Sequence, residues 1–127
     1  MSKLAAKVIA DGFKELKIEY GFGIYAKNPV IYPYFVGDYT ESESFSEDGL
    51  VESTWSLTGF SRDTWETLET AREKIEKYFD RIDGKIGRAD DGSIIVCSYS
   101  GSLIVPTGDP ELKKIQINLN VKEWRTN

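Results

Sequence analysis

The chain has 127 residues, a net charge of −5 and no histidine, and this composition excludes several classes of function. Without an imidazole general base near neutral pH, Ser–His and Cys–His nucleophile pairs are ruled out. A single cysteine, Cys97, rules out an intramolecular disulfide and leaves too few ligands for a structural zinc site. The acidic balance and the dispersed lysines and arginines argue against nucleic acid as the main partner.

Length and composition predict one domain over residues 1–127. The hydrophobic share of 40% is enough for a core, and no run approaches the roughly 18 apolar residues of a membrane span. Met1–Leu4 leads directly into an amphipathic pattern, so we expect no signal peptide, a cytoplasmic location and no membrane partner. Cys97 lies in an apolar run and is expected to be a small buried side chain.

The first expected element is a helix over residues 3–18. Gly12 costs about 1 kcal/mol relative to alanine inside a helix, so packing must hold this segment in place. Residues 19–28 follow as a connection rich in glycine and aromatic residues. The apolar stripe of the helix consists of Leu4, Val8, Ile9, Phe13 and Leu16.

A strand is expected over residues 30–36, where Val30, Ile31 and Tyr32 begin a run of strand-forming residues. Pro33 has no amide donor, which places this strand at a sheet edge or near a bulge. The acidic segment 37–49 is expected to be a mobile loop or the splayed tip of a long hairpin. It has few apolar residues to offset the entropy of ordering.

The next expected elements are a strand over residues 50–60 and a helix over residues 64–81. Asp63 and Glu66 have the spacing of a capping box, which predicts where the helix begins. Its apolar stripe, which we expect to face the sheet, consists of Trp65, Leu68, Ile75, Phe79 and Ile82.

Strands are also expected over residues 94–99 and 115–121, with a bulge or turn at Ser100-Gly101 before a short run at 103–105. The last strand alternates apolar and polar residues, as in an antiparallel sheet with one buried face. The element order predicts an α+β fold. It consists of a mostly antiparallel sheet of four to five strands with two main helices packed on one face.

No segment carries a convincing catalytic or metal-binding motif. Asp90-Asp91-Gly92 lacks the alternating ligands and closing glutamate of a calcium loop, so a turn is the favoured interpretation. Gly21-Phe22-Gly23 does not match a phosphate-binding loop. A glycosidase-type carboxylate pair within 37–49 would need one raised pKa, and a solvated loop offers nothing to raise it. An enzyme is therefore the least favoured class, and we predict no catalytic residue, cofactor or metal.

An interface with another subunit or partner is the favoured role for the conspicuous polar and aromatic residues. Tyrosine anchors many interfaces, and the first third of the chain is rich in it, although core packing is the alternative for each side chain. The acidic residues would need basic partners on a neighbouring molecule. The candidate interface residues are Tyr32, Tyr34, Asp38, Glu41, Glu43, Glu47, Arg62, Arg72 and Arg81.

The order of elements resembles that of small tail-terminator (tail-completion) proteins of long-tailed, non-contractile bacteriophages and prophages. The resemblance covers most of the chain. It rests on the helix Leu4–Leu16, the strand Pro29–Val36, the hairpin ending in Trp55–Arg62, the helix Asp63–Phe79 and the strand Ile115–Val121.

This resemblance implies a non-enzymatic α+β domain that forms a six-membered ring on the end of the tail tube, stops tube polymerisation and presents a surface to the head. The implied partners are the protein itself, the tail-tube protein and a head-completion protein. The implied location is the host bacterial cytoplasm during assembly and then the virion tail. Two alternatives remain open: another head–tail connector or tail-tube subunit, and a small cytoplasmic protein-binding or inhibitor domain.

Overall fold

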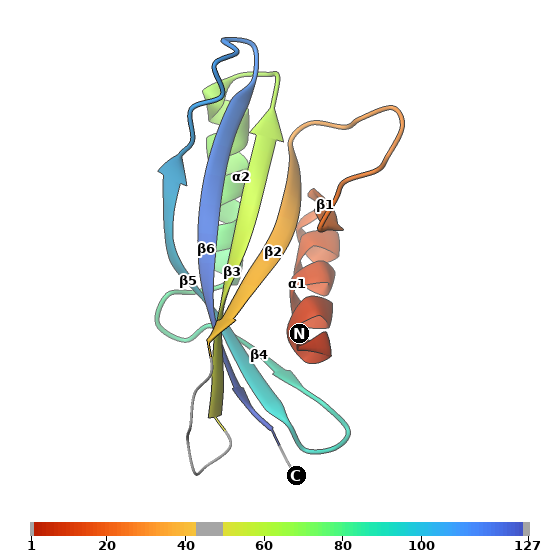
Figure 1. Cartoon of the computed structure of the whole chain (residues 1–127), viewed down its shortest axis with the longest axis vertical. Coiled ribbons are helices and arrows are strands. Elements are labelled where there is room, and N and C mark those ends of the chain that lie inside the picture. The colour runs from red at the N-terminus through yellow and green to blue at the C-terminus, as the bar shows by residue number, and fades with distance from the viewer. Residues whose placement is uncertain (1, 43–49, 126–127) are drawn as a thin grey trace.

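The computed structural model describes residues 2–42 and 50–125, which form two helices and one six-stranded sheet (Figure 1). In chain order the elements are α1 (Lys3–Leu16), β1 (Glu19–Phe22), β2 (Tyr34–Ser42), β3 (Leu50–Ser61), α2 (Trp65–Tyr78), β4 (Lys85–Arg88), β5 (Ile94–Ile104) and β6 (Lys113–Trp124). The strand order is β1-β2-β3-β6-β5-β4. The pair β1–β2 is parallel and the other pairs are antiparallel.

The predicted α+β class is confirmed, but the sheet has six strands in place of four to five and is mixed. The two additional strands, β1 and β4, are four residues long and lie at the sheet edges. Strands this short carry too little alternation to be recognised from sequence.

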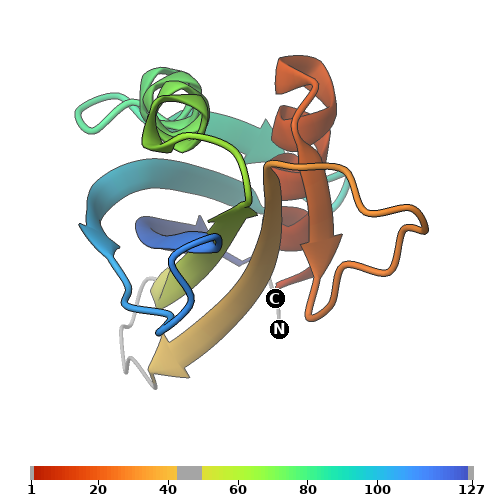
Figure 2. The ribbon, with the colours of Figure 1, turned by 90° about the horizontal axis from the view of Figure 1, so that it is seen from above.

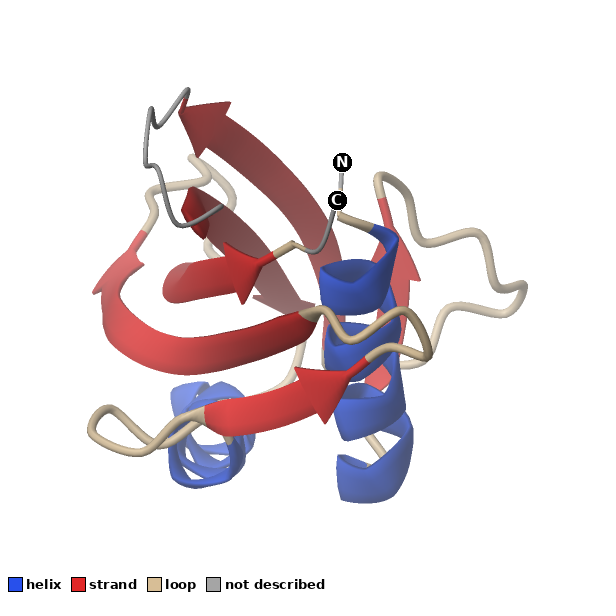
Figure 3. Ribbon diagram, turned by 90° about the horizontal axis from the view of Figure 1, so that it is seen from below, coloured by secondary structure: helices blue, strands red, loops and turns tan. Residues whose placement is uncertain are grey.

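Both helices lie on the same side of the curled sheet, as two opposite views show (Figure 2, Figure 3). Helix α1 packs against β1, β4 and β5, and α2 packs against β3 and β6. Each large apolar side chain buried between these layers stabilises the fold by roughly 1.5–3 kcal/mol. The largest fully buried side chains are Trp55, Phe13, Phe35, Phe79, Ile9, Leu57, Leu68, Ile75, Ile95, Ile117, Leu119 and Val121.

Helix α1 begins at a cap that connects the two ends of the described chain. The Ser2 hydroxyl accepts a hydrogen bond from the Ala5 amide (3.0 Å) and donates one to the buried carboxylate of Glu123. The helix ends two residues earlier than expected, with Lys17 in the left-handed conformation (φ 59°). Gly12 allows close packing, because a Cβ added there would lie 2.7 Å from Cε1 of Tyr78.

Helix α2 differs from the prediction at both ends. Its N-cap is Thr64, whose hydroxyl accepts from the Thr67 amide (3.3 Å), so the capping box at Asp63 was misplaced by one residue. Leu68, Ile75 and Phe79 are fully buried, as predicted.

The prediction that the whole apolar stripe of α2 faces the sheet is wrong for two of its members. Trp65 is 46% exposed and Ile82 is 91% exposed. Trp65 is the first residue of the helix and Ile82 lies beyond its end at Tyr78, so neither faces the middle of the sheet.

The hairpin of β2 and β3 corrects the prediction for residues 30–49. Residues 30–33 form no strand, and β2 begins only at Tyr34. Residues 37–42, expected in a mobile acidic loop, belong to β2 and pair with β3 from Gly37–Leu57 to Ser42–Glu52. The rest of that segment, 43–49, lies outside the described residues. Because β1 pairs with the start of β2, the strand after Pro33 is not an edge strand there.

The C-terminal half agrees more closely with the sequence. Residues 89–93 join β4 to β5 in a turn, as expected, with the Ala89 amide donating to the Ser93 carbonyl (2.9 Å). A register shift between Tyr99 and Gly101 confirms the bulge in β5. The alternation in β6 is also confirmed, because Ile115, Ile117, Leu119 and Val121 are buried against the helices. Cys97 is buried too, as predicted.

Candidate interaction surface

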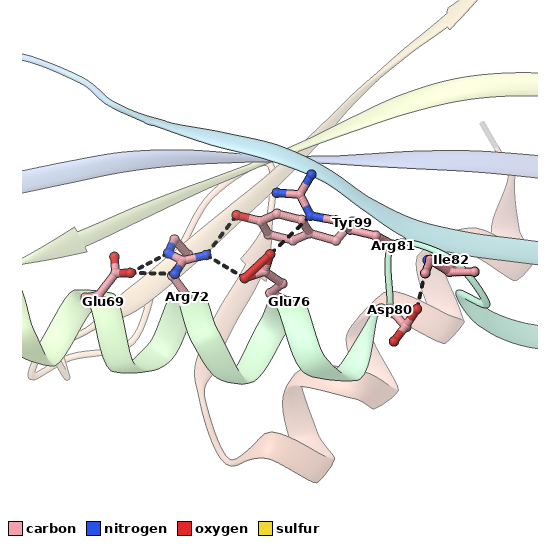
Figure 4. Close-up of polar contacts among 7 residues, drawn as sticks. All are labelled: Glu69, Arg72, Glu76, Asp80, Arg81, Ile82 and Tyr99. Atoms are coloured by element: carbon pink, nitrogen blue, oxygen red, sulfur yellow. Dashed lines mark hydrogen bonds and ion pairs between the residues drawn. The ribbon is translucent and has the colours of Figure 1, made fainter.

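Arg72 and Arg81, two of the predicted interface residues, form ion pairs within their own chain (Figure 4). Arg72 contacts Glu69 (2.5 Å) and Glu76 (3.0 Å), and also donates to the Tyr99 hydroxyl (3.1 Å). Arg81 pairs with Glu76 (3.2 Å), and its guanidinium lies 5.0 Å from the centre of the Tyr99 ring.

These contacts shift the pKa values of the groups involved. Hydrogen bonds from Arg72 lower the pKa of Glu69 and, together with Arg81, that of Glu76. The bond to Glu69 is the largest of the contacts that raise the pKa of Arg72. The expected role of Arg72 and Arg81 as partners for a neighbour's acids therefore competes with these internal pairs.

An aromatic cluster forms around the start of β2, where Tyr34 and Phe60 lie on the sheet face away from the core. Tyr34 in β2 is its centre: its ring stacks on Tyr25 (4.4 Å between centroids), on Phe60 (5.1 Å) and, more tilted, on Tyr32 (5.6 Å). The Lys114 ammonium lies 5.4 Å from the centre of the Phe60 ring. Cross-strand pairing explains the arrangement, because Tyr34 lies opposite Phe60 and Phe60 lies opposite Lys114.

Polar groups surround this cluster. Arg62 forms an ion pair with Asp109 (3.4 Å), and a hydrogen bond with Tyr32 raises the pKa of its guanidinium. Burial raises the pKa of the Tyr34 hydroxyl above its ordinary value of 10. Beside the rings is an open hollow of about 520 Å³, and Asp38 contributes to its lining.

The structure therefore brings together four of the nine predicted interface residues: Tyr32, Tyr34, Asp38 and Arg62. The cluster also contains Tyr25, one of the aromatic residues expected to suit an interface in the first third of the chain, and Phe60 and Lys114, which the sequence prediction did not include. Alternation in the strand 50–60 could have placed Phe60 on the face away from the core. Of the other predicted residues, Arg72 and Arg81 lie on or just after α2, and Glu41 lies in β2. Glu43 and Glu47 lie outside the described residues.

Away from the aromatic cluster, the sheet face opposite the helices is mainly polar and uncharged. Its central strand presents Gln116, Asn118 and Asn120, and Asn118 accepts hydrogen bonds from Gln116 (3.0 Å) and Ser56 (3.3 Å). Amide and hydroxyl side chains form hydrogen bonds with water, so this face can remain solvated. A partner that binds through apolar contacts is therefore expected at the two sides of the sheet rather than across its middle.

Comparison with known proteins adds no assignment: no protein-family model matches the sequence, and no curated protein matches it.

Two further properties concern metal binding and membrane crossing. In residues 2–42 and 50–125, no group of three cysteine, aspartate or glutamate side chains is arranged to hold a metal ion. Neither helix within this part of the chain has the length and apolar character that crossing a membrane requires.

Proposed function

We propose that this protein is a non-enzymatic structural subunit that forms a ring, caps a phage tail tube and offers a surface for joining the head. The observation that carries the proposal is the pair of exposed strand edges on the two sides of the sheet. Figure 1 shows β2 and β5 on opposite sides of the central strands β3 and β6.

Each of these strands is longer than its outer neighbour. Within the described part of the chain, β1 pairs with only the first four of the nine residues of β2. On the other side, β4 pairs with only the first four of the eleven residues of β5. Residues 38–42 and 98–104 thus extend past their outer neighbours. On the β5 side, the Tyr99 amide donates to the Phe79 carbonyl (2.7 Å).

Exposed strand edges are natural sites for adding another chain. Because the two edges belong to different segments, a contact between them joins two unlike surfaces of neighbouring copies. Repetition of such a contact generates a ring if the rotation closes. This supports self-association. The tube cap is proposed from the resemblance in element order, with the tail-tube protein and a head-completion protein as partners.

An alternative is a small binding or inhibitor domain that acts through the aromatic cluster around Tyr34. That cluster combines stacked rings with Arg62 and Lys114, a composition typical of interface centres. Ring formation is favoured because it also accounts for the exposed strand edges.

The test is to polymerise the tail-tube protein encoded nearest to this gene, with and without the chain, and image the products by electron microscopy. We expect shorter tubes of more uniform length, with extra density at one end. The matched control replaces the chain with an unrelated acidic protein of similar size. Tubes of uncontrolled length with bare ends would refute the proposed function.

A further inference from the structure

The connection between β1 and β2, residues 23–33, projects from the side of the sheet and is called the arm here (Figure 1, Figure 2). Its apolar side chains face solvent: Ile24 is 71% exposed and Ile31 is 43% exposed, and Val30 and Tyr32 are exposed as well. Lys27 is its only charged residue. An exposed apolar group of this kind on a projecting segment indicates an interaction site.

The arm is anchored at its base by polar contacts. The Tyr25 hydroxyl donates to Glu19 (2.8 Å) and accepts from the Ile31 amide (3.4 Å), while the Tyr25 ring stacks on Tyr34. Lys27 pairs with the same carboxylate of Glu19 (3.1 Å). These contacts fix the arm before any partner binds, which reduces the entropy lost on association.

Part of the arm has a strand-forming sequence but no strand. Val30, Ile31 and Tyr32 have high strand propensity, yet they pair with no strand in the described part of the chain. Pro29 and Pro33 flank this run and limit its pairing to three residues. These three residues would form a short strand if they paired with a strand edge of another chain.

An apolar depression lies on the other side of the molecule, between the start of α2 and the end of β5, and is called the groove here. Its floor contains the buried residues Leu68 and Ile115, and its walls are Trp65 and Ile104, which is 67% exposed. The groove encloses about 390 Å³ and borders the exposed edge of β5. Its remaining lining residues, Glu66 and Glu69, are both acidic.

We propose that the arm of one copy docks in the groove of the next copy. Both surfaces are apolar, and the unpaired strand-forming run of the arm can add to the strand edge that borders the groove. Charge contributes little, because Lys27 is paired with Glu19 and Glu69 is paired with Arg72 within each copy. In Figure 1 the arm and the upper end of β5 lie at about the same height on opposite sides of the molecule, as a head-to-tail contact requires. The contact rests on the self-association in the proposed function and not on the identity of the tube.

The test uses two single-site variants, Ile31→Cys in the arm and Ile104→Cys in the groove, cross-linked with a short bismaleimide. The native Cys97 is buried, so wild-type protein serves as the background control. The matched control pairs Ile31→Cys with Ile82→Cys, because Ile82 is even more exposed but lies outside both surfaces. Circular dichroism verifies that each variant is folded.

We expect cross-linked dimer in the mixture of Ile31→Cys and Ile104→Cys, several-fold above either variant alone and above the control mixture. Equal cross-linking in the control mixture would overturn the proposal. Dimers formed by Ile104→Cys alone would also overturn it, because they would indicate that two grooves face each other.

The variant Ile31→Asp, which places a charge in the arm, tests the arm contact separately from the proposed function. If Ile31→Asp still gives end density on tail tubes, the arm contact is refuted while tube capping stands. If wild-type protein leaves the tubes bare, tube capping is refuted whatever the cross-linking shows.

Discussion

Phe79 and Trp65 lie at opposite ends of α2 and provide the sharpest test of how this helix packs. Both belong to the apolar stripe predicted from sequence, yet Phe79 is fully buried and Trp65 is 46% exposed. Phe79 also meets Tyr78 edge-on (4.8 Å between centroids) and approaches Gly12 of α1. Phe79→Ala should therefore leave a cavity at the junction of the two helices and the sheet.

A cavity of this kind costs about 3–5 kcal/mol. For a domain of this size, that loss corresponds to a decrease of roughly 10–20 °C in melting temperature. Trp65→Ala should cost less, about 1–2 kcal/mol, because nearly half of its side chain is already in water. Equilibrium urea unfolding, followed by far-UV circular dichroism at constant pH, measures both values.

Equal losses for the two variants would refute this account of α2. A Phe79→Ala protein with the denaturation midpoint of the wild type would also refute it. An unchanged m-value is the internal control, because it shows that the variants expose the same surface on unfolding.

Two further predictions concern titratable groups. The lowered pKa values of Glu69 and Glu76 contribute stability above their ordinary value of 4.5, and this contribution is lost as the pH falls through their folded values. Arg72→Met should therefore show a flatter decrease of urea midpoint below about pH 4.5 than wild type, and parallel curves would contradict the ion-pair assignment. Burial raises the pKa of Cys97 to about 12, so iodoacetamide at pH 8 should label it slowly in the native protein and rapidly in denaturant. Rapid labelling of the native protein would show that β5 is not packed as described.

The elements predicted correctly are those in which the spacing of apolar residues repeats over several helical turns or several alternations along a strand. The alternation in β6 is unambiguous because both of its neighbours are long strands and only one of its faces is covered. Leu68 and Ile75 were predicted correctly because they lie in the middle of α2, where helical periodicity alone decides which residues are buried.

The errors arise where tertiary structure decides. Periodicity places Trp65 on the same stripe as Leu68, but it cannot show that the groove at the start of α2 leaves Trp65 exposed. Strand propensity in Val30 and Ile31 is a preference that needs a partner strand, and the described chain supplies none at that position.

The candidate interface was predictable only in part for the same reason. Sequence shows that Arg62 and Arg72 are charged, but not what their charges meet. The fold places Arg62 beside Tyr32 and Asp109 at the aromatic cluster. Arg72 instead forms ion pairs with glutamates of its own helix.

The position of β6 has a consequence for synthesis. Among the six strands of this sheet, β6 leaves the ribosome last, yet it lies in the centre, between β3 and β5. Until it emerges, the nascent chain holds two separate groups of strands whose apolar faces, including Trp55 and Ile95, lack their shared neighbour. Unfinished chains that stop before residue 113 should therefore be substrates for chaperones and proteases, and the complete sheet can form only after β6 has been translated.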